Sequence, residues 1–330
     1  MKKKLNIVSV LFLLFFFGTI AGIAWLCVKP IPTETLVSSP SWFMTYEESV
    51  ERVKAMYAQD GADIADNGHL ILLSHGKKTP NAIVFFHGST NSPRQFADLG
   101  KIFFQKGYNV FIPRIPHHGL KDRMTGDHAN LTAEEMVKLC DESVDIARGL
   151  GEHVTVVGLS LGANMTSWVA QNRLDVDKAV IISPFWGWKE IPFIFWKPSV
   201  NLAATLPNMF LWWDKNEKMA FKGPQSTYCR FSTRGLGQIM RLGWCVLKQA
   251  KGSAPGTRSI VVITNALDEA VNQANIKAVV RQWQKHSNVN LTLFTFDKSY
   301  GVYHDLIDPE QPYQKTEKVY PRLISLIVAP

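Results

Sequence analysis

The stretch that decides the fold is VTVVGLSLGANM, residues 154–165. Its first half is apolar and β-branched, which is typical of a buried strand, and its second half predicts the start of a helix. Gly158, Ser160 and Gly162 lie at the junction. Glycine tolerates a bend in which side chains would collide, so this spacing predicts a sharp turn that lifts the Ser160 hydroxyl above the strand end. Ser160 is therefore a candidate nucleophile; a serine that merely caps the following helix is the alternative.

Outward from this turn, apolar strand-like runs alternate with amphipathic helical patterns. Fully apolar strands separated by helices predict an α/β fold, in which a mostly parallel central sheet is covered by helices on both faces. The expected strands are 69–73, 82–86, 109–113, 154–158, 179–183, 259–264 and 290–296, and the expected helices are 46–59, 93–106, 132–149, 161–172, 271–286 and 313–327. Residues 184–257 interrupt the alternation and contain six of the ten tryptophans.

The N-terminus carries a candidate membrane segment. Residues 5–28 contain no charged side chain, and as a helix they would reach about 36 Å, enough to cross a bilayer core of about 30 Å. Three lysines precede the segment and Lys29 alone directly follows it, a bias that predicts a cytoplasmic N-terminus and a main domain outside the cytoplasm, periplasmic in a bacterium. We expect a signal anchor. A cleaved signal peptide, which would leave a secreted protein, is the alternative, because Gly22-Ile23-Ala24 offers small residues for cleavage.

Composition places the remainder of the chain among globular proteins. Apolar residues make up 46% and charged residues 19%, which excludes disordered and fibrous classes. The formal charge is +8, but four lysines flank the membrane segment, and without them 32 basic residues face 28 acidic ones. This balance does not indicate a nucleic-acid partner. Thiols outside the cytoplasm can be oxidised, and the sequence leaves a Cys229–Cys245 disulfide open.

A serine hydroxyl needs a base that removes its proton and a carboxylate that orients the base. For a serine at this kind of turn, the expected chain order is serine, acid, histidine. Only His286 and His304 follow Ser160. His286 ends an amphipathic helix, whereas His304 follows the last strand at the carboxyl edge of the sheet, where ligands bind in α/β folds. We therefore predict His304 as the base.

Asp268 is the predicted acid. It directly follows an apolar strand and lies in a loop at the same sheet edge. Asp297, Asp305 and Glu269 are rivals. Asp297 ends the strand that leads to the histidine, Asp305 is the histidine's chain neighbour, and Glu269 adjoins the favoured Asp268, so each is less well placed.

Two backbone groups are candidates to bind the negative oxygen of a tetrahedral intermediate, which needs preorganised N–H donors. The N–H of Leu161, directly after the nucleophile, is one. The other is the N–H of Ser89 in FFHGSTNSP, residues 85–93, where an expected strand ends in His87-Gly88. A turn that only ends the strand is the alternative for this loop.

These residues resemble the α/β-hydrolase superfamily, in particular its esterase, monoacylglycerol lipase and lysophospholipase branch. The resemblance covers about residues 60–328 and rests on HGSTNSP, GYNVFIPRIPHHG, GLSLG, NALDEAV and GVYHD. The residues it implies for the triad and the two backbone donors are Ser160, Asp268, His304, Ser89 and Leu161. HGST departs from the HGGG loop of many lipases and is similar to the HGFT-type loop of smaller carboxylesterases, so we do not assume a long-chain triacylglycerol substrate.

The resemblance also implies an α/β-hydrolase fold with a helical cap, or lid, inserted after the strand that ends at Ser183. The expected organisation is a signal-anchor transmembrane helix at 1–29, a linker and short helix at 30–59, the core at 60–183 and 258–330, and the cap at 184–257.

The predicted cap concentrates the positive charge of the chain. It carries ten basic and three acidic residues, interleaved with aromatic ones. Trp186, Trp212 and Trp213 are candidates for substrate binding. Lysines beside tryptophans are typical of surfaces that dock on anionic lipid, which predicts a cap that faces the bilayer. A folded cap with core tryptophans and solvated lysines is the alternative.

Taken together, these features lead us to expect a membrane-anchored serine hydrolase that cleaves carboxylic esters through an acyl-enzyme on Ser160. The expected substrate is a small-molecule or lipid ester, with a lipid-like one of monoacylglycerol or lysophospholipid type favoured. Two alternatives stay open: an amide or peptide hydrolase with the same triad, and a non-catalytic membrane-anchored scaffold. No metal ion or organic cofactor is implied.

Overall fold

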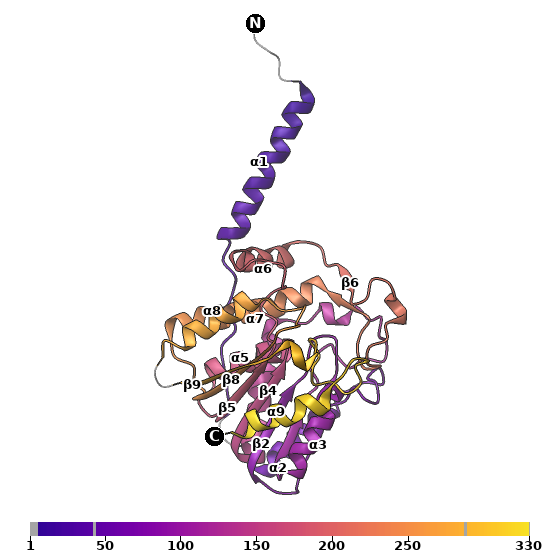
Figure 1. Ribbon diagram of the computed structural model, residues 1–330, viewed down its shortest axis with the longest axis vertical. Helices are drawn as coiled ribbons and strands as arrows, with labels where there is room; N and C mark the ends of the chain where they lie inside the picture. Colours follow the sequence, from indigo (N-terminus) through magenta and orange to yellow (C-terminus); the bar gives the residue numbers. More distant parts are fainter. Residues whose placement is uncertain (1–5, 42–43, 287–288, 330) are drawn as a thin grey trace.

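The computed structural model describes residues 6–41, 44–286 and 289–329. The lysines that set the predicted membrane orientation, Lys2, Lys3 and Lys4, lie outside these residues. The central sheet has the strand order β1-β3-β2-β4-β5-β8-β9 (Figure 1). β1 pairs antiparallel with β3, and the other neighbours pair in parallel, which confirms the predicted mostly parallel α/β sheet. The strands are β1 (Ile71–Leu73), β2 (Thr79–Phe86), β3 (Asn109–Ile112), β4 (Gly151–Leu159), β5 (Lys178–Ile182), β8 (Ser259–Asn265) and β9 (Asn290–Phe296).

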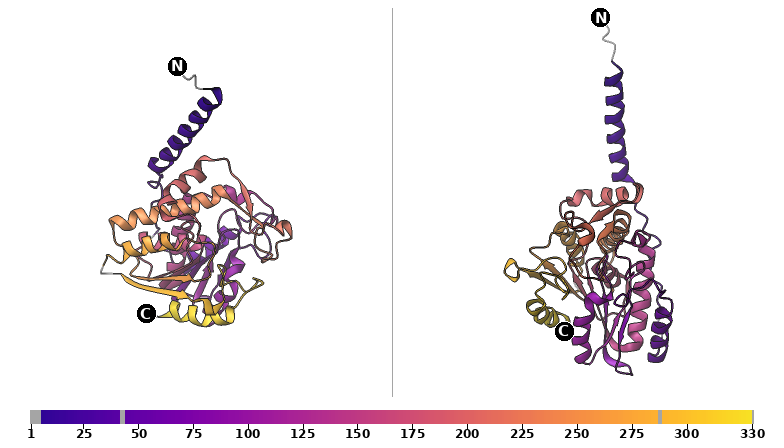
Figure 2. Two further views of the ribbon diagram at one scale, coloured as in Figure 1. Left: turned by 45° about the horizontal axis from the view of Figure 1, so that its top comes forward. Right: turned by 90° about the vertical axis from the view of Figure 1, so that its right-hand side faces the viewer.

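Helices cover both faces of the sheet (Figures 1 and 2). Along β2, Ile83 and Phe85 pack in a cluster with residues of α3 and α9, whereas Val84 and Phe86 pack in a second cluster with residues of α4, α5, α7 and α8. This alternation follows from the two-residue period of a strand and buries both sides of the sheet. The helices of the main domain are α2 (Tyr46–Tyr57), α3 (Ala97–Gln105), α4 (Ala133–Leu150), α5 (Leu161–Asn172), α8 (Gln273–Trp283) and α9 (Thr316–Val328).

The predicted cap contains more than helices. It holds α6 (Trp196–Thr205), the antiparallel strands β6 (Phe210–Trp212) and β7 (Arg230–Ser232), and α7 (Thr233–Gly252). The two strands form a small separate sheet that the sequence did not predict, because each is only three residues long. α7 packs against α5 as well as α6, and its buried side chains belong to the main core cluster. This helix, which falls within the predicted cap, therefore belongs to the layer that covers one face of the central sheet.

The N-terminal helix α1 (Ile7–Val28) is long and apolar enough to cross a membrane, and none of its side chains is buried against the rest of the chain. Its last turn lies against α6 (Figure 1). Asn201 Nδ2 on α6 donates to the carbonyl oxygens of Leu26 and Lys29 at 2.8 and 2.9 Å. Lys197 Nζ donates to the carbonyl oxygen of Val28 at 3.0 Å. α6 is thus held at the point where α1 leaves the domain.

All four cysteines are free thiols. Cys229 lies next to β7, Cys245 lies within α7, and both are buried. The disulfide that the sequence left open is therefore not formed.

The predicted linker packs onto the domain as a strap. Within residues 30–41, Leu36 has no exposed surface and Ile31 is nearly as buried. The Leu36 carbonyl oxygen accepts a hydrogen bond from Trp168 Nε1 at 3.2 Å. Compositional signals for a linker, proline and serine, do not distinguish a free tether from an ordered segment whose hydrogen bonds go to the domain.

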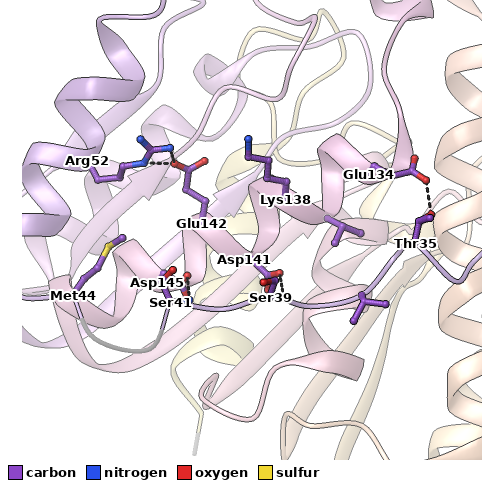
Figure 3. A pocket seen from close by; sticks show the side chains of 12 residues that line it. Thr35, Ser39, Ser41, Met44, Arg52, Glu134, Lys138, Asp141, Glu142 and Asp145 are labelled. Atoms are coloured by element: carbon purple, nitrogen blue, oxygen red, sulfur yellow. Dashed lines mark hydrogen bonds and ion pairs between the residues drawn. The ribbon is translucent and has the colours of Figure 1, made fainter.

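A surface pocket of about 540 Å³ lies between this strap, α2 and α4 (Figure 3). Arg52 of α2 and Glu142 of α4 form an ion pair at one end of it, and Thr35 of the strap bonds Glu134 of α4 at the other. None of the predicted site residues lines this pocket. It is a feature of the strap and lies apart from the candidate site.

A buried arginine anchors the strap. Ser38 Oγ donates to Asp141 Oδ1 at 2.6 Å, and the Ser41 N–H donates to Asp145 Oδ2 at 2.7 Å. Both carboxylates are also paired with Arg173, at 3.0 and 2.6 Å, and the Arg173 side chain is 1% exposed. The guanidinium neutralises carboxylates that would otherwise be buried without a counter-charge.

We predict that Arg173→Gln destabilises the protein by about 3 to 5 kcal/mol, because it leaves the carboxylates of Asp141 and Asp145 uncompensated. The free energy of unfolding of the full chain in detergent, from denaturant titration, measures this effect. Arg281→Gln on the exposed face of α8 is the matched control and should change stability by less than about 0.5 kcal/mol. Equal stability of the two variants would contradict the role of Arg173.

Candidate active site

The turn between β4 and α5 holds Ser160 at φ +57° and ψ −112°, a conformation that non-glycine residues rarely adopt. The two motif glycines make this turn possible. A Cβ added to Gly158 would lie 2.1 Å from the carbonyl oxygen of Gly162, and one added to Gly162 would lie 1.9 Å from that of Phe86. The Ser160 N–H donates to the Ile182 carbonyl oxygen on β5 at 3.0 Å. Strain of this kind in a non-glycine residue is typical of functional positions.

His304 and Asp268 form a hydrogen-bonded pair. His304 Nδ1 lies 2.9 Å from Asp268 Oδ2. The other oxygen of Asp268 accepts from the N–H groups of Ala270 and Val271 at 2.9 and 3.3 Å, so the carboxylate is held on both sides. Of the four candidate acids, Asp268 is the one that hydrogen-bonds the ring, whereas Asp297 is exposed and bonds Ser299.

Electrostatics in this pair favour the charged forms. Burial by itself lowers the pKa of His304, but the Asp268 carboxylate, helped by Asp305, outweighs it and raises that pKa to about 9. For Asp268, burial acts to raise the pKa, and the neighbouring His304 reverses the balance, so the pKa lies below its usual value. The imidazole is therefore a stronger base than a free histidine.

Sheet topology gathers these residues at one edge. Ser160 follows β4, Asp268 follows β8 and His304 follows β9, and the carboxyl ends of parallel strands lie at the same edge of a sheet. β5 separates β4 from β8, which puts the two strand ends about 10 Å apart. No hydrogen bond joins the Ser160 hydroxyl to His304 among the described residues; such contacts are often long in enzymes without substrate.

Asn265 is a site-supporting residue that sequence analysis missed. Its Nδ2 donates to the carbonyl oxygens of Val302 and Tyr303 at 2.8 and 2.9 Å, which ties the histidine loop to the end of β8. The side chain is 2% exposed. A polar residue that ends an otherwise apolar strand, three positions before Asp268, was the signal available for it.

The loop after β2 lies beside the nucleophile. A Cβ added to Gly88 would lie 3.7 Å from Ser160 Cβ. His87 Nε2 accepts from the Ile115 N–H, which leaves Nδ1 to donate to the Gly88 carbonyl oxygen. Burial lowers the pKa of His87 to about 4, so this ring stays neutral and its role is to shape the loop.

Both predicted backbone donors are unengaged within the described chain. Neither the Ser89 N–H nor the Leu161 N–H donates to another group there. Gln95 holds the loop after β2 through two hydrogen bonds. Its Oε1 accepts from the Gly88 N–H at 2.8 Å, and its Nε2 donates to Asp305 at 3.2 Å. Gln95 therefore joins the loop that carries Ser89 to the loop that carries His304.

The three predicted substrate-binding tryptophans lie in different environments. Trp186 has no exposed surface, because its ring lies against Gly243 of α7 and Trp283 of α8, so its side chain belongs to the core and not to the surface of a substrate site. Trp212 is partly buried in β6. Trp213 is 38% exposed, and its Nε1 donates to Thr90 Oγ1 in the loop after β2 at 3.0 Å. Of these three tryptophans, Trp213 is the one that hydrogen-bonds the loop beside Ser160.

No cluster of three or more histidine, cysteine or carboxylate side chains that would hold a metal ion is found in the described residues. The candidate site holds a hydroxyl, an imidazole–carboxylate pair and two amide donors, a set of groups that acyl transfer requires.

Three enzymes are among the solved structures of similar fold. The first is from the work on LipS and LipT, two metagenome-derived lipolytic enzymes, with 16% identity, a TM-score of 0.56 and coverage of 80% of this chain and 98% of that one. The Paleococcus ferrophilus monoacylglycerol lipase has 18% identity, a TM-score of 0.56 and coverage of 79% and 99%. A soluble variant of the Saccharomyces cerevisiae monoglyceride lipase has 13% identity, a TM-score of 0.55 and coverage of 78% and 90%. These likenesses concern the fold.

The two sequence comparisons gave different results. A search of curated proteins found no match. The family model described as the alpha/beta hydrolase family matches residues 83–292. This range includes the β4–α5 turn, the loop after β2 and Asp268, and it exceeds half of the sequence. With the strand order and the serine turn described above, it shows that the chain belongs to the alpha/beta hydrolase family.

Proposed function

We propose that the protein is a serine hydrolase that cleaves carboxylic esters through an acyl-enzyme on Ser160. The observation that carries this proposal is the 2.9 Å pair of His304 Nδ1 and Asp268 at the sheet edge where Ser160 occupies its strained turn. His304 Nε2 removes the Ser160 proton as the hydroxyl attacks the ester carbonyl, and Asp268 holds the ring and stabilises the imidazolium.

The remaining steps of acylation, and the deacylation that follows, use the same histidine and the two predicted backbone donors. The N–H groups of Ser89 and Leu161 bind the oxyanion, and the imidazolium of His304 gives its proton to the leaving alcohol. Water then attacks the acyl-enzyme with His304 as base, which releases the acid and restores Ser160.

We further propose that the substrate is lipid-like and reaches the site from a membrane to which α1 anchors the protein, with the catalytic domain outside the cytoplasm. Contacts with the end of α1 hold α6 at the surface of a bilayer that α1 would cross. The stretch from the 3-10 helix η3 (Phe193–Phe195) to β6 exposes large apolar side chains on this part of the cap. They are Phe193, Ile194, Phe195, Leu202, Leu206, Met209 and Leu211. Such a concentration is typical of surfaces that contact lipid or another protein.

We predict that Ser160→Ala abolishes both hydrolysis of a short-chain p-nitrophenyl ester, by at least about 10³-fold, and labelling by a fluorophosphonate probe. Ser325→Ala on the exposed face of α9 is the control and should behave as wild type. An esterase-active or probe-labelled Ser160→Ala protein would refute the acyl-enzyme on Ser160. An inactive, unlabelled wild type would favour the scaffold alternative, and a matched amide cleaved faster than the ester would favour an amidase.

We predict a pH profile set by His304. Because the base must be neutral and its pKa is raised to about 9, kcat/KM should rise with pH through that region. Asp268→Asn removes the carboxylate that raises this pKa, so the rising limb should move to lower pH while kcat falls by about 10⁴-fold. Initial rates between pH 5 and 10 measure both effects. A limb that stays in place in Asp268→Asn would show that another group controls it.

We predict that Ile194→Ser combined with Phe195→Ser lowers hydrolysis of monoacylglycerol in vesicles by at least about tenfold, since removing even one apolar side chain from water is worth about 1.5 to 3 kcal/mol and about 1.4 kcal/mol is a factor of ten. Hydrolysis of a soluble short-chain ester should not change. The control pair is Leu174→Ser with Leu293→Ser, two exposed apolar residues outside the cap. Equal losses on both substrates, or in the control pair, would contradict membrane contact through this part of the cap.

A further inference from the structure

Thr90 adopts a conformation that its side chain disfavours. Its φ is +62°, in the left-handed region, where a β-branched residue is an outlier. It directly follows Ser89, whose N–H is a proposed oxyanion donor. A strained residue persists only where its surroundings hold it in place. The contacts of Thr90 therefore identify what holds the oxyanion loop.

The cap supplies those contacts. Trp213 Nε1 donates to Thr90 Oγ1 at 3.0 Å, and the Tyr228 N–H donates to the Thr90 carbonyl oxygen at 2.8 Å. The hydroxyl of Thr90 in turn donates to the Ser89 carbonyl oxygen at 2.6 Å. The cap thus bonds both the side chain and the carbonyl oxygen of Thr90, and the Thr90 hydroxyl in turn bonds Ser89.

The two cap donors come from adjoining chain segments beyond the β6–β7 sheet. The Trp213 N–H donates to the Cys229 carbonyl oxygen at 3.2 Å, which extends the pairing of the two strands by one step. The Trp213 ring packs against Phe231 with ring centroids 4.4 Å apart. Tyr228 is fully buried. Trp213 and Tyr228 therefore act from one rigid unit.

A third cap contact reaches the next residue of the loop. Ser226 Oγ donates to Asn91 Oδ1 at 3.2 Å, while Asn91 Nδ2 donates to Asp308 in the histidine loop at 3.1 Å. The segment from Ser89 to Asn91 is consequently clamped between the cap and the loop that carries His304.

We propose that Trp213 and Thr90 are positioning residues of the oxyanion site, through which the cap sheet sets the direction of the Ser89 N–H. The inference rests on the proposed function. Without the indole donor, Thr90 relaxes from its strained conformation and Ser89 turns with it. The loss is felt in the transition state, where the oxyanion forms, and lowers kcat; a tryptophan that only lined the substrate pocket would change KM instead.

The test compares Trp213→Phe, which removes the N–H and keeps an aromatic ring, with Thr90→Val, which removes the hydroxyl and keeps the branched shape. We expect each variant to lower kcat on a soluble short-chain ester about tenfold and to leave KM nearly unchanged. This loss is smaller than the roughly 10²- to 10³-fold loss of kcat that follows the removal of an oxyanion donor itself. Trp213→Phe removes the donor and Thr90→Val the acceptor of the same hydrogen bond, so the double variant should be no slower than Thr90→Val alone, which also loses the bond to Ser89. Thr90→Ser, which keeps the hydroxyl, should restore kcat.

Trp244→Phe, in the partly buried part of α7 against Trp196, controls for loss of a cap indole and should leave kcat as in wild type. Melting temperatures are measured for every variant. Trp213 is more than one-third exposed, so we expect Trp213→Phe to fold even if a Thr90 variant does not fold. Unchanged kcat in a folded Trp213→Phe protein, a Thr90→Ser as slow as Thr90→Val, or additive losses would each overturn the proposal.

Wild type and Ser160→Ala are run in the same assay. If Ser160→Ala is as active as wild type, the proposed function fails. If Ser160→Ala is inactive while the Trp213 and Thr90 variants match wild type, the proposed function stands and the positioning role alone is rejected.

Discussion

The close contact of α5 with the end of β2 is the constraint on which the rest of the site depends. At Gly162 a side chain would collide with the Phe86 carbonyl oxygen at 1.9 Å, so the helix can lie there only with glycine at this position. The contact brings the first amide of α5, at Leu161, beside the loop that carries Ser89. One steric condition thus sets the place of the nucleophile and the separation of the two proposed oxyanion donors.

Carboxylates then tune what the turn positions. Asp268 and Asp305 both raise the pKa of His304, so the imidazole is a strong base that is largely protonated at neutral pH. Burial together with Asp305 raises the pKa of Asp308 to about 7. Asp305 accepts from Gln95, which also holds the Gly88 N–H, and Asp308 accepts from Asn91. The groups beside the base are therefore the groups that fasten the loop after β2.

Sequence patterns predict what depends on local order. Apolar strands, the glycines around Ser160 and the chain order of Asp268 and His304 led to the confirmed fold and to residues that lie at one sheet edge. Contacts between distant segments were out of reach. Trp168 bonds the strap from 132 residues away, and the Trp213–Thr90 bond spans 123. Composition marked residues 30–41 as a linker because proline and serine carry no information on where their backbone bonds go.

The positive charge of the predicted cap is another feature whose partners lie far away in the sequence. Several of its basic side chains bond other parts of the chain, which weakens them as a signal of lipid binding. Arg241 and Lys248 bind the strap and its neighbour Glu134, Lys197 binds the end of α1, and Arg230 binds the Met124 carbonyl oxygen. Charges satisfied inside the chain attract anionic lipid weakly, because their fields are partly cancelled by their partners. The exposed apolar stretch beside α1, which needs a non-aqueous neighbour whatever the lipid charge, is therefore the stronger support for a cap that meets the bilayer.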